Sequence, residues 1–497
     1  KMIMLWTILI GVLAVVYYQL VPNVLEPTLW ENPPPLTHFE GKLAVNQVLA
    51  NAQRAEGHYH GPESIAFDSE LGTAYVSFGD GVVRSFSGEG KELGPVFFTV
   101  GFINGSMQGD GLDSAHEPLQ NWCYTESVAN RLAWDTEGEK RCGRPLGIRF
   151  RKEEDIKYLY IVDAYHGIFK LNLETHYTVA LVTPDTPIKF HRLSDRSVAT
   201  KTPLFFNDLD ISLDGKVVFT DSSDRHTRSN NRPEILDGAP RGRLFQYDPV
   251  TQGVSLLLCG LHFPNGVQFL APKVEYHTET VYVAGTVNEE GVAGPGTTEE
   301  RTVEKVVQQE VLVNELTRFR VLKVNTHKVL SNVASLTASC EEDGGLYQAL
   351  AMNAHTESEN YAITGVTTFI PNIPGLVDNV RRDTKLSKDG KEYYLFGLGS
   401  KSTAPFSLLW TVLQSNLLRE IIERVVPMKL VEKLVPRYGL VLVANDEGEL
   451  INALHDPSGG VAMLSQASRH PLTGDLWLGS HSEPLAILPA RFLPENW

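Results

Sequence analysis

The chain has 497 residues, of which 42% are hydrophobic and 21% charged, a composition typical of a folded protein rather than a disordered one. Its formal net charge of -16 at pH 7 argues against a nucleic-acid partner, because phosphate binding requires a basic surface. An acidic surface suits metal ions and cationic or neutral ligands, and it also serves solubility alone.

The N-terminal segment differs from the rest of the chain. Residues 2–21 include no charged side chain, and about 20 apolar residues are what a helix needs to cross a bilayer. A cleaved signal peptide is the alternative, but its apolar region would be shorter and would end in a small-residue cleavage site. We therefore predict a transmembrane signal anchor over residues 1–22 and a proline-rich stalk over 23–40. The protein is then a single-pass type II membrane protein whose domain is extracellular or in the lumen of the secretory pathway.

The four cysteines are too few for a disulfide scaffold. Cys123 and Cys142 are close in sequence, and an oxidising compartment would let them pair. Cys259 and Cys340 lie among apolar residues and are expected to be buried thiols. Asn104 begins an Asn-Gly-Ser acceptor for N-glycosylation, in agreement with such a compartment.

From residue 41 onward one unit recurs: an apolar-alternating strand that starts near a glycine or asparagine, a turn, and an aromatic-rich strand. The six openings lie at 61–67, 143–150, 206–212, 263–269, 377–382 and 461–468. Repeated sheets that cannot bury their faces alone indicate a β-propeller, whereas a β-sandwich would not repeat one unit along most of the chain. We predict an all-β, six-bladed propeller over residues 41–497.

Two segments interrupt the repeat. The stretch of about 274–310 is polar and is interpreted as an insertion. Residues 404–434, in the fifth blade, place apolar side chains at helical spacing before Pro427 and are predicted to be a helical insert. The sequence leaves two roles for this insert: it either packs on the propeller or contacts the membrane.

Polar residues stand at four blade openings where apolar ones would be expected. They are Glu63, Asn207, Asn265, and the pair Asp378 and Asn379. Because the innermost strand of every blade lines the central channel of a propeller, these side chains should converge on the axis. Two carboxylates and several amide oxygens suit a hard cation such as Ca²⁺ rather than zinc. The sequence therefore predicts a Ca²⁺ site at the axis.

Several motifs in order resemble strictosidine synthase-like proteins. They are Gly61-Pro-Glu-Ser, Cys142-Gly-Arg-Pro-Leu-Gly-Ile, Phe206-Asn-Asp-Leu-Asp-Ile, Phe219-Thr-Asp-Ser-Ser and Phe263-Pro-Asn-Gly-Val. The resemblance implies a six-bladed propeller related to paraoxonases and gluconolactonases, with a calcium ion held by the same five polar residues. It also implies a disulfide between Cys123 and Cys142. The segments of about 274–310 and 331–368 depart from the usual length of the family and are interpreted as insertions.

The same resemblance limits the reaction. Strictosidine synthase has a catalytic glutamate in the strand that follows the Asp-Asn opening, and residues 393–402 include no acid, so the amine–aldehyde condensation is rejected. The histidine that paraoxonases use as a base is replaced by Leu146. Calcium-dependent hydrolysis of a small aryl ester or lactone is favoured, with His262 as the first candidate general base and His60 and His166 as others. A non-catalytic cell-surface binding or adhesion propeller with a structural calcium is the alternative.

Overall fold

The computed structural model contains six sheets of four or five antiparallel strands. It describes residues 20, 22–30, 32–55, 57, 61–99, 105–106, 123, 136–191, 198–283, 297–331, 365–385, 390–427, 430 and 435–494. The first strands of the sheets contact one another in the order β2 (Ile65–Phe67), β7 (Pro145–Glu153), β13 (Phe206–Ile211), β17 (Pro264–Phe269), β23 (Gly375–Arg382), β27 (Leu464–Arg469), and β27 contacts β2 again. This closed order confirms the predicted six-bladed all-β propeller.

Each blade continues outward in chain order. Blade 1 adds β3 (Ala74–Ser77), β4 (Val82–Phe86) and β5 (Glu92–Phe98). Blade 2 adds β8 (Ile156–Asp163), β9 (Gly167–Asn172), β10 (Tyr177–Val182) and β6 (Gly105–Ser106). Blade 3 adds β14 (Val217–Asp221), β15 (Gly242–Asp248) and β16 (Gly253–Leu261). Blade 4 adds β20 (Glu310–Glu315), β21 (Arg320–Asn325) and β22 (Val366–Ile370). Blade 5 adds β24 (Tyr393–Lys401), β25 (Gly439–Asn445) and β26 (Leu450–Asp456). Blade 6 adds β28 (Leu476–Ser480), β29 (Ala486–Leu488) and β1 (Gln53–Arg54). The ring is thus closed by the N-terminal strand β1, which pairs with β29 of the last blade.

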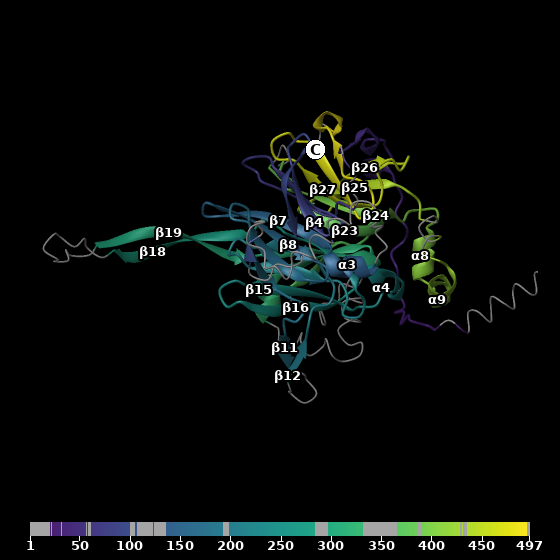
Figure 1. The fold of residues 1–497 in the computed structure, drawn as a ribbon, viewed down its shortest axis with the longest axis horizontal. Helices are drawn as coiled ribbons and strands as arrows, with labels where there is room; N and C mark the ends of the chain where they lie inside the picture. The colour runs from purple at the N-terminus through teal and green to yellow at the C-terminus, as the bar shows by residue number, and fades with distance from the viewer. Residues whose placement is uncertain are drawn as a thin grey trace, which may run out of the picture.

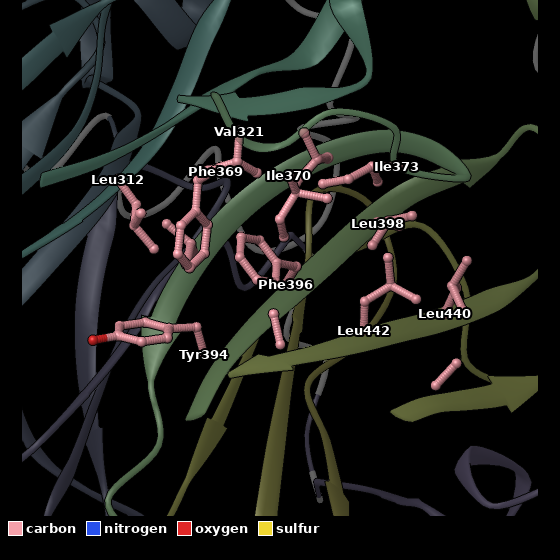
Figure 2. Close-up of a cluster of buried hydrophobic side chains, with 14 of the residues drawn as sticks. Leu312, Val321, Phe369, Ile370, Ile373, Tyr394, Phe396, Leu398, Leu440 and Leu442 are labelled. Atoms are coloured by element: carbon pink, nitrogen blue, oxygen red, sulfur yellow. The ribbon is translucent and has the colours of Figure 1, made fainter. Parts of the chain in front are cut away.

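Apolar side chains hold adjacent blades together. Figure 2 shows the cluster between blades 4 and 5, in which Phe369 of blade 4 meets Tyr394 and Phe396 of β24. Leu395, the residue between them, packs instead against blade 6, as the two-residue period of a strand requires. Burial of one such large side chain contributes roughly 1.5–3 kcal/mol, so each interblade cluster contributes substantially to stability.

The inner strands approach one another closely at the axis. A side-chain Cβ added at Gly147 of β7 would lie 2.2 Å from Asp208 Oδ1, and one added at Gly266 of β17 would lie 2.6 Å from the Cα of Asn379. Both positions therefore require glycine because the neighbouring strand occupies the space of a side chain.

A buried carboxylate connects four of the blades at this point. Asp208 of β13 accepts hydrogen bonds from Arg381 of β23 at 2.8 and 3.1 Å and from the backbone N–H of Val267 of β17 at 2.9 Å. Arg149 of β7 lies 3.3 Å from the same carboxylate. Burial would raise the pKa of Asp208, but the charges of Arg149 and Arg381 outweigh it and hold the pKa below its ordinary value.

The same network reaches the two remaining blades. Arg381 Nη2 also donates to Ser64 Oγ, just before β2, at 2.9 Å. Ser64 Oγ in turn donates to Gln466 Oε1 of β27 at 2.8 Å. One continuous set of hydrogen bonds therefore joins the inner strands of all six blades.

The N-terminal stretch is not a free stalk in this structure. Leu25 and Trp30 are 4% and 7% exposed, and they pack against the body of the propeller. Asn372 Nδ2 donates to the carbonyl of Pro35, and Thr37 forms an isolated bridge with Thr403. Residues 22–37, which we call the strap, therefore lie along the propeller surface.

The insert of blade 5 is helical and lies beside the strap. It contains α8 (Leu408–Leu413) and α9 (Asn416–Val425), between β24 and β25. The side chains of Ser407 and Ser415 cap the two helices by accepting hydrogen bonds from the N–H groups of Trp410 and Leu418. Figure 1 shows both helices beside the purple N-terminal stretch.

The polar insertion in blade 4 forms an extended hairpin. Strands β18 (Lys273–Val283) and β19 (Thr297–Gln308) pair antiparallel along most of their length. Figure 1 shows this hairpin projecting from the body of the propeller. Most of the other predicted insertion, 331–368, lies outside the described residues, and its last residues begin β22.

The predicted membrane anchor lies almost wholly outside the described residues. Among the helices of the described ranges, none combines the length and the apolar character that crossing a membrane requires. Asn104 of the glycosylation acceptor also lies outside these ranges.

The cysteine predictions were right for one pair and wrong for Cys259. Cys123 and Cys142, at the end of α3 (Thr136–Cys142), form a disulfide that closes a sequence separation of 19 residues. Cys259 is also disulfide-bonded, and its partner lies outside the described residues. The apolar surroundings of Cys259 suggested a thiol, but burial suits a disulfide equally well, so composition alone does not separate the two.

The axis network is expected to stabilise the whole ring. Asp208→Asn should lower the free energy of unfolding by about 3–5 kcal/mol, because it leaves the buried guanidinium of Arg381 without its paired carboxylate. Urea denaturation measures this difference. Asp214→Asn is the matched control, since Asp214 pairs with Lys216 but its side chain is 47% exposed, and it should cost less than about 1 kcal/mol. Equal losses in the two variants would contradict the role given to Asp208.

Candidate functional site

The predicted site residues lie where the inner strands are irregular. The register between the first and second strands shifts between Phe206 and Leu209, between Pro264 and Val267, and between Val377 and Val380. These three bulges contain Asn207, Asn265, and Asp378 with Asn379. A bulge redirects side chains locally, so neighbouring residues such as Asn207 and Asp208 can both serve the axis.

Glu63 comes from the stretch that leads into β2. Its backbone carbonyl accepts hydrogen bonds from Asn379 Nδ2 at 3.5 Å and from Ser465 Oγ of blade 6 at 2.7 Å. Asn265 also contacts Asp378, to which it gives a side-chain hydrogen bond. The structure therefore brings residues of blades 1, 4 and 5 together at one end of the axis.

Three oxygens at this place have no hydrogen-bond partner although they are buried. They are Asn265 Oδ1, Asp378 Oδ1 and Asn379 Oδ1. An unsatisfied buried polar atom costs about 1–3 kcal/mol, and each such atom in a folded protein calls for an explanation. Three such oxygens beside one axis indicate a site for a cation, which accepts electron pairs from several oxygens at once.

Asn207 contributes from blade 3. Its Nδ2 donates to Ser222 Oγ at 2.8 Å, and Ser222 Oγ donates to the carbonyl of Pro264 at 2.6 Å. These bonds engage the nitrogen of the amide and fix its orientation. The oxygen is the polar atom of Asn207 that remains for a ligand.

Charge at the site is concentrated on two carboxylates. The pKa of Asp378 is raised well above its ordinary value, first by burial and then by the charges of Glu63 and Asp208. Glu63 Oε2 accepts a hydrogen bond from Arg144 Nη2 at 3.0 Å, and Arg144 is only 2% exposed. Arg144 thus neutralises Glu63, and Asp378 is the carboxylate that a bound cation would stabilise.

The donor set fits a hard cation. Glu63, Asn207, Asn265, Asp378 and Asn379 offer carboxylate and amide oxygens, and a Ca²⁺ ion takes six to eight oxygens, so water or a bound molecule would supply the rest. Within the described ranges, no group of three or more His, Cys, Asp or Glu side chains is arranged so that it could hold a metal ion. The site therefore depends on amide oxygens, which zinc sites rarely use.

His262 lies apart from these residues. It is 2% exposed, its Nδ1 lies 2.8 Å from the carbonyl of Gly238, and its backbone N–H donates to Glu315 at 2.8 Å. Burial and the nearby charges of Arg318 and Arg320 lower its pKa well below the ordinary value. The contacts described for His262 are those of a structural residue, and they include none of the five axis residues.

His481, which the sequence did not single out, is closer to the axis. Its backbone carbonyl lies 3.5 Å from Arg144 Nη2, and its imidazole interacts electrostatically with Glu63 and Arg228. Burial lowers the pKa of His481, the charge of Glu63 opposes this shift, and those of Arg228 and Arg144 add to it. The imidazole is therefore held neutral near pH 7. The only sequence signal was its position directly after the Trp-Leu-Gly-Ser of β28, the strand that pairs with the inner strand β27.

Of the other histidines considered, His60 lies outside the described residues. His166 follows β8, where its backbone N–H donates to Asp163 Oδ1 at 3.1 Å and its buried Nε2 has no hydrogen-bond partner. A hollow of about 20 Å³, room for roughly one water, lies elsewhere on blade 3, beside Ile188, Phe245 and Leu256.

Comparison with known proteins agrees with the motifs. Residues 41–86 match the family model described as "Strictosidine synthase-like, N-terminal", and residues 207–276 match the one described as "Strictosidine synthase". The adipocyte plasma membrane-associated protein of Bos taurus is 28% identical over 463 residues, which cover 92% of this chain and 82% of the relative. Protein strictosidine synthase-like 13 of Arabidopsis thaliana is 37% identical over 210 residues, or 42% and 44% of the two chains.

Among solved structures, a gluconolactonase from Xanthomonas campestris covers 95% of this chain and 99% of its own, with a TM-score of 0.40 and 12% identity. A likeness at that level carries no argument about the site. The matches to both family models and to named relatives confirm that this chain resembles the strictosidine synthase-like proteins.

Proposed function

We propose that this chain is a membrane-anchored, calcium-dependent hydrolase of small aryl esters or lactones, built on a strictosidine synthase-like propeller. The observation that carries the proposal is the set of three buried, unpartnered oxygens on Asn265, Asp378 and Asn379. Calcium bound there would polarise a substrate carbonyl and stabilise the negative charge that develops on its oxygen.

The side chains of this chain would supply the remaining functions. Asn207 is held by a hydrogen bond to Ser222 of its own blade and Asn265 by one to Asp378 of blade 5, so both amides would be oriented toward a bound ion. His481, neutral near pH 7, would accept a proton from the attacking water. Glu63 would stabilise the imidazolium that results, and Arg144 would hold Glu63 in position. This assignment gives His481 the role that the sequence had suggested for His262.

A non-catalytic binding or adhesion propeller with a structural calcium is the second candidate. The pairing of Glu63 with Arg144 favours it, because an arginine beside the site already satisfies one of the two carboxylates. The hollow described on blade 3 also lies away from the axis. Both functions require the ion, and turnover distinguishes them.

Calcium binding is tested first. A ligand present at 100 times its dissociation constant stabilises a protein by about 2.7 kcal/mol. Calcium should therefore raise the melting temperature of the EDTA-treated protein, and Asp378→Asn should abolish the rise because it removes the charge that attracts the ion. Asp214→Asn is the control, and it should respond to calcium like the wild type. A wild-type protein that does not respond, or an Asp378→Asn variant that responds fully, would contradict the site.

The pH dependence of the metal-free protein tests the same residue independently. The pKa of Asp378 is higher in the folded state than its ordinary value of 3.8. Protonation of Asp378 therefore stabilises the folded state fully at a pH below 3.8, and this stabilisation is lost as the pH rises through the folded-state pKa. The free energy of unfolding of the EDTA-treated wild type should thus fall with pH relative to that of Asp378→Asn, and calcium should reverse the fall. Urea denaturation at a series of pH values measures both slopes, and identical slopes would count against a buried, unpaired Asp378.

Turnover is tested with aryl acetates and lactones, with and without EDTA. Removing a general base typically costs 10²–10⁴-fold in rate. His481→Gln should therefore lower kcat by about that factor and leave the calcium-induced rise in melting temperature intact. His262→Gln is the contrast: it should lower the melting temperature, because Gly238 loses its partner, but preserve turnover in the folded fraction.

Absence of turnover in the calcium-loaded wild type would select the binding propeller. Turnover that is indifferent to EDTA would exclude calcium from the reaction. Turnover that survives in His481→Gln would remove the role assigned to that histidine.

A further inference from the structure

The helical insert of blade 5 is apolar on both sides. Its inner side is buried: Val412 packs with Leu25 of the strap and Leu236, and Leu418 and Ile422 pack against them. On the other side of α9, Leu417, Ile421 and Val425 are 62%, 36% and 39% exposed. Residues four apart lie on one face of a helix, so these three form a continuous exposed stripe.

Two further exposed apolar residues of the insert lie just before α8 and at its first position. Phe406 and Leu408 are 67% and 44% exposed. We call these two residues, together with Leu417, Ile421 and Val425, the outer face. Scattered exposed apolar residues are normal on a protein surface, but five on one short helical insert indicate an interaction site.

The charged side chains of α9 do not interrupt the outer face. Arg424 Nη2 lies 3.4 Å from Glu420 and Arg232 Nε lies 2.9 Å from Glu423. Arg419 is 1% exposed and donates to the backbone carbonyls of Thr28 and Asp237, at 2.9 Å each. With its charges paired or buried, the outer face suits an uncharged apolar partner.

The strap brings a second apolar region to the same place. The carbonyl of Val24 accepts a hydrogen bond from Arg225, and Glu26 N–H donates to Asp237 Oδ1 at 2.7 Å, so this end of the strap is fixed beside α9. Val24 is 44% exposed and Leu20 76%. Figure 1 shows the purple N-terminal stretch leaving the propeller body below α9.

In the sequence, the strap is preceded by the uncharged segment 2–21. A chain spans at most ~3.6 Å per residue, so the few residues between Val21 and Leu25 cannot carry that segment far from the outer face. An apolar partner that takes up residues 2–21 would therefore also meet Phe406, Leu417 and Ile421.

We propose that the outer face lies in the interfacial layer of a lipid bilayer and holds the propeller body against the membrane. Amphipathic helices bind such surfaces by inserting their apolar side into the boundary between headgroups and acyl chains. Because the charges of α9 are paired or buried, docking of this helix should need no anionic lipid. This proposal does not depend on calcium or on hydrolysis.

The test uses the full chain, reconstituted into phosphatidylcholine vesicles that contain a lipid with a photoactivatable diazirine in its acyl chain. After irradiation and digestion, mass spectrometry should find label on residues 402–413, which contain α8. The triple variant Leu417→Ser, Ile421→Ser and Val425→Ser should reduce that label at least about tenfold, because the stripe on α9 no longer inserts. The label is measured on residues 402–413, whose sequence is the same in this variant and in the wild type. A change in label there therefore cannot come from a different chemical reactivity of the substituted residues.

A matched control replaces three exposed leucines elsewhere. Leu71, Leu213 and Leu472 are 69%, 57% and 61% exposed and lie in turns between the first and second strands of blades 1, 3 and 6. Changing all three to serine should leave the label on residues 402–413 unchanged. Thermal unfolding of both variants verifies that they fold, as expected for substitutions of exposed side chains.

Three outcomes would overturn the proposal. One is label on residues 1–21 without label on 402–413, which would show an anchor without docking. Another is equal labelling of α8 in the wild type and the outer-face variant. The third is a wild-type dimer in single nanodiscs that becomes monomeric in the outer-face variant, which would assign the outer face to a second copy of the chain.

Discussion

The carboxylate of Asp208 is the interaction on which the rest of the architecture depends. A propeller has no central apolar core, because its six inner strands converge on an axis that side chains must fill without steric conflict. Here Asp208 accepts from Arg381 and from the backbone of blade 4, and Arg381 continues to Ser64 of blade 1. A buried ion pair is a weak source of stability by itself, but its geometry is demanding. The network thereby fixes the register of the blades and the positions of the bulges that present Asn207, Asn265 and Asp378.

At one end of the axis the Asp208 carboxylate is paired with two arginines, whereas at the other end three buried oxygens have no hydrogen-bond partner. Burial alone would raise the pKa of Asp208, but the charges of Arg149 and Arg381 beside it lower that pKa. Around Asp378, burial and then the charges of Glu63 and Asp208 raise the pKa. The two aspartates lie on β13 and β23, on either side of β17, and both are buried, so the opposite directions of their pKa shifts come from Arg149 and Arg381 beside Asp208 and from Glu63 beside Asp378. Electrostatic asymmetry along one axis is what separates a structural centre from a candidate ligand site.

The fold and the polar axis residues could be predicted because each depends on local sequence. The blade openings recur, and Asn207, Asn265 and Asp378 interrupt apolar strands at the same point of each unit. The roles of histidines could not be predicted this way. His262 is only three residues from Asn265, yet it points to Gly238, whereas His481 is distant in sequence and reaches Glu63 through the closure of the ring. The docked strap was missed for a similar reason: proline content predicts stiffness but not the surface on which a segment lies.

The pairing of β1 with β29 has a consequence for synthesis. Residues 53–54 leave the ribosome more than 430 residues before their partners, residues 486–487. At about 5–20 residues per second, the first strand waits roughly 20–90 s for its partner. Throughout that time blade 6 does not exist, and the faces of blades 1 and 5 that it will cover are exposed to other chains. Non-local closure of this kind is slow and favours misassembly, so the nascent chain of this protein should depend on chaperones until β29 has been made.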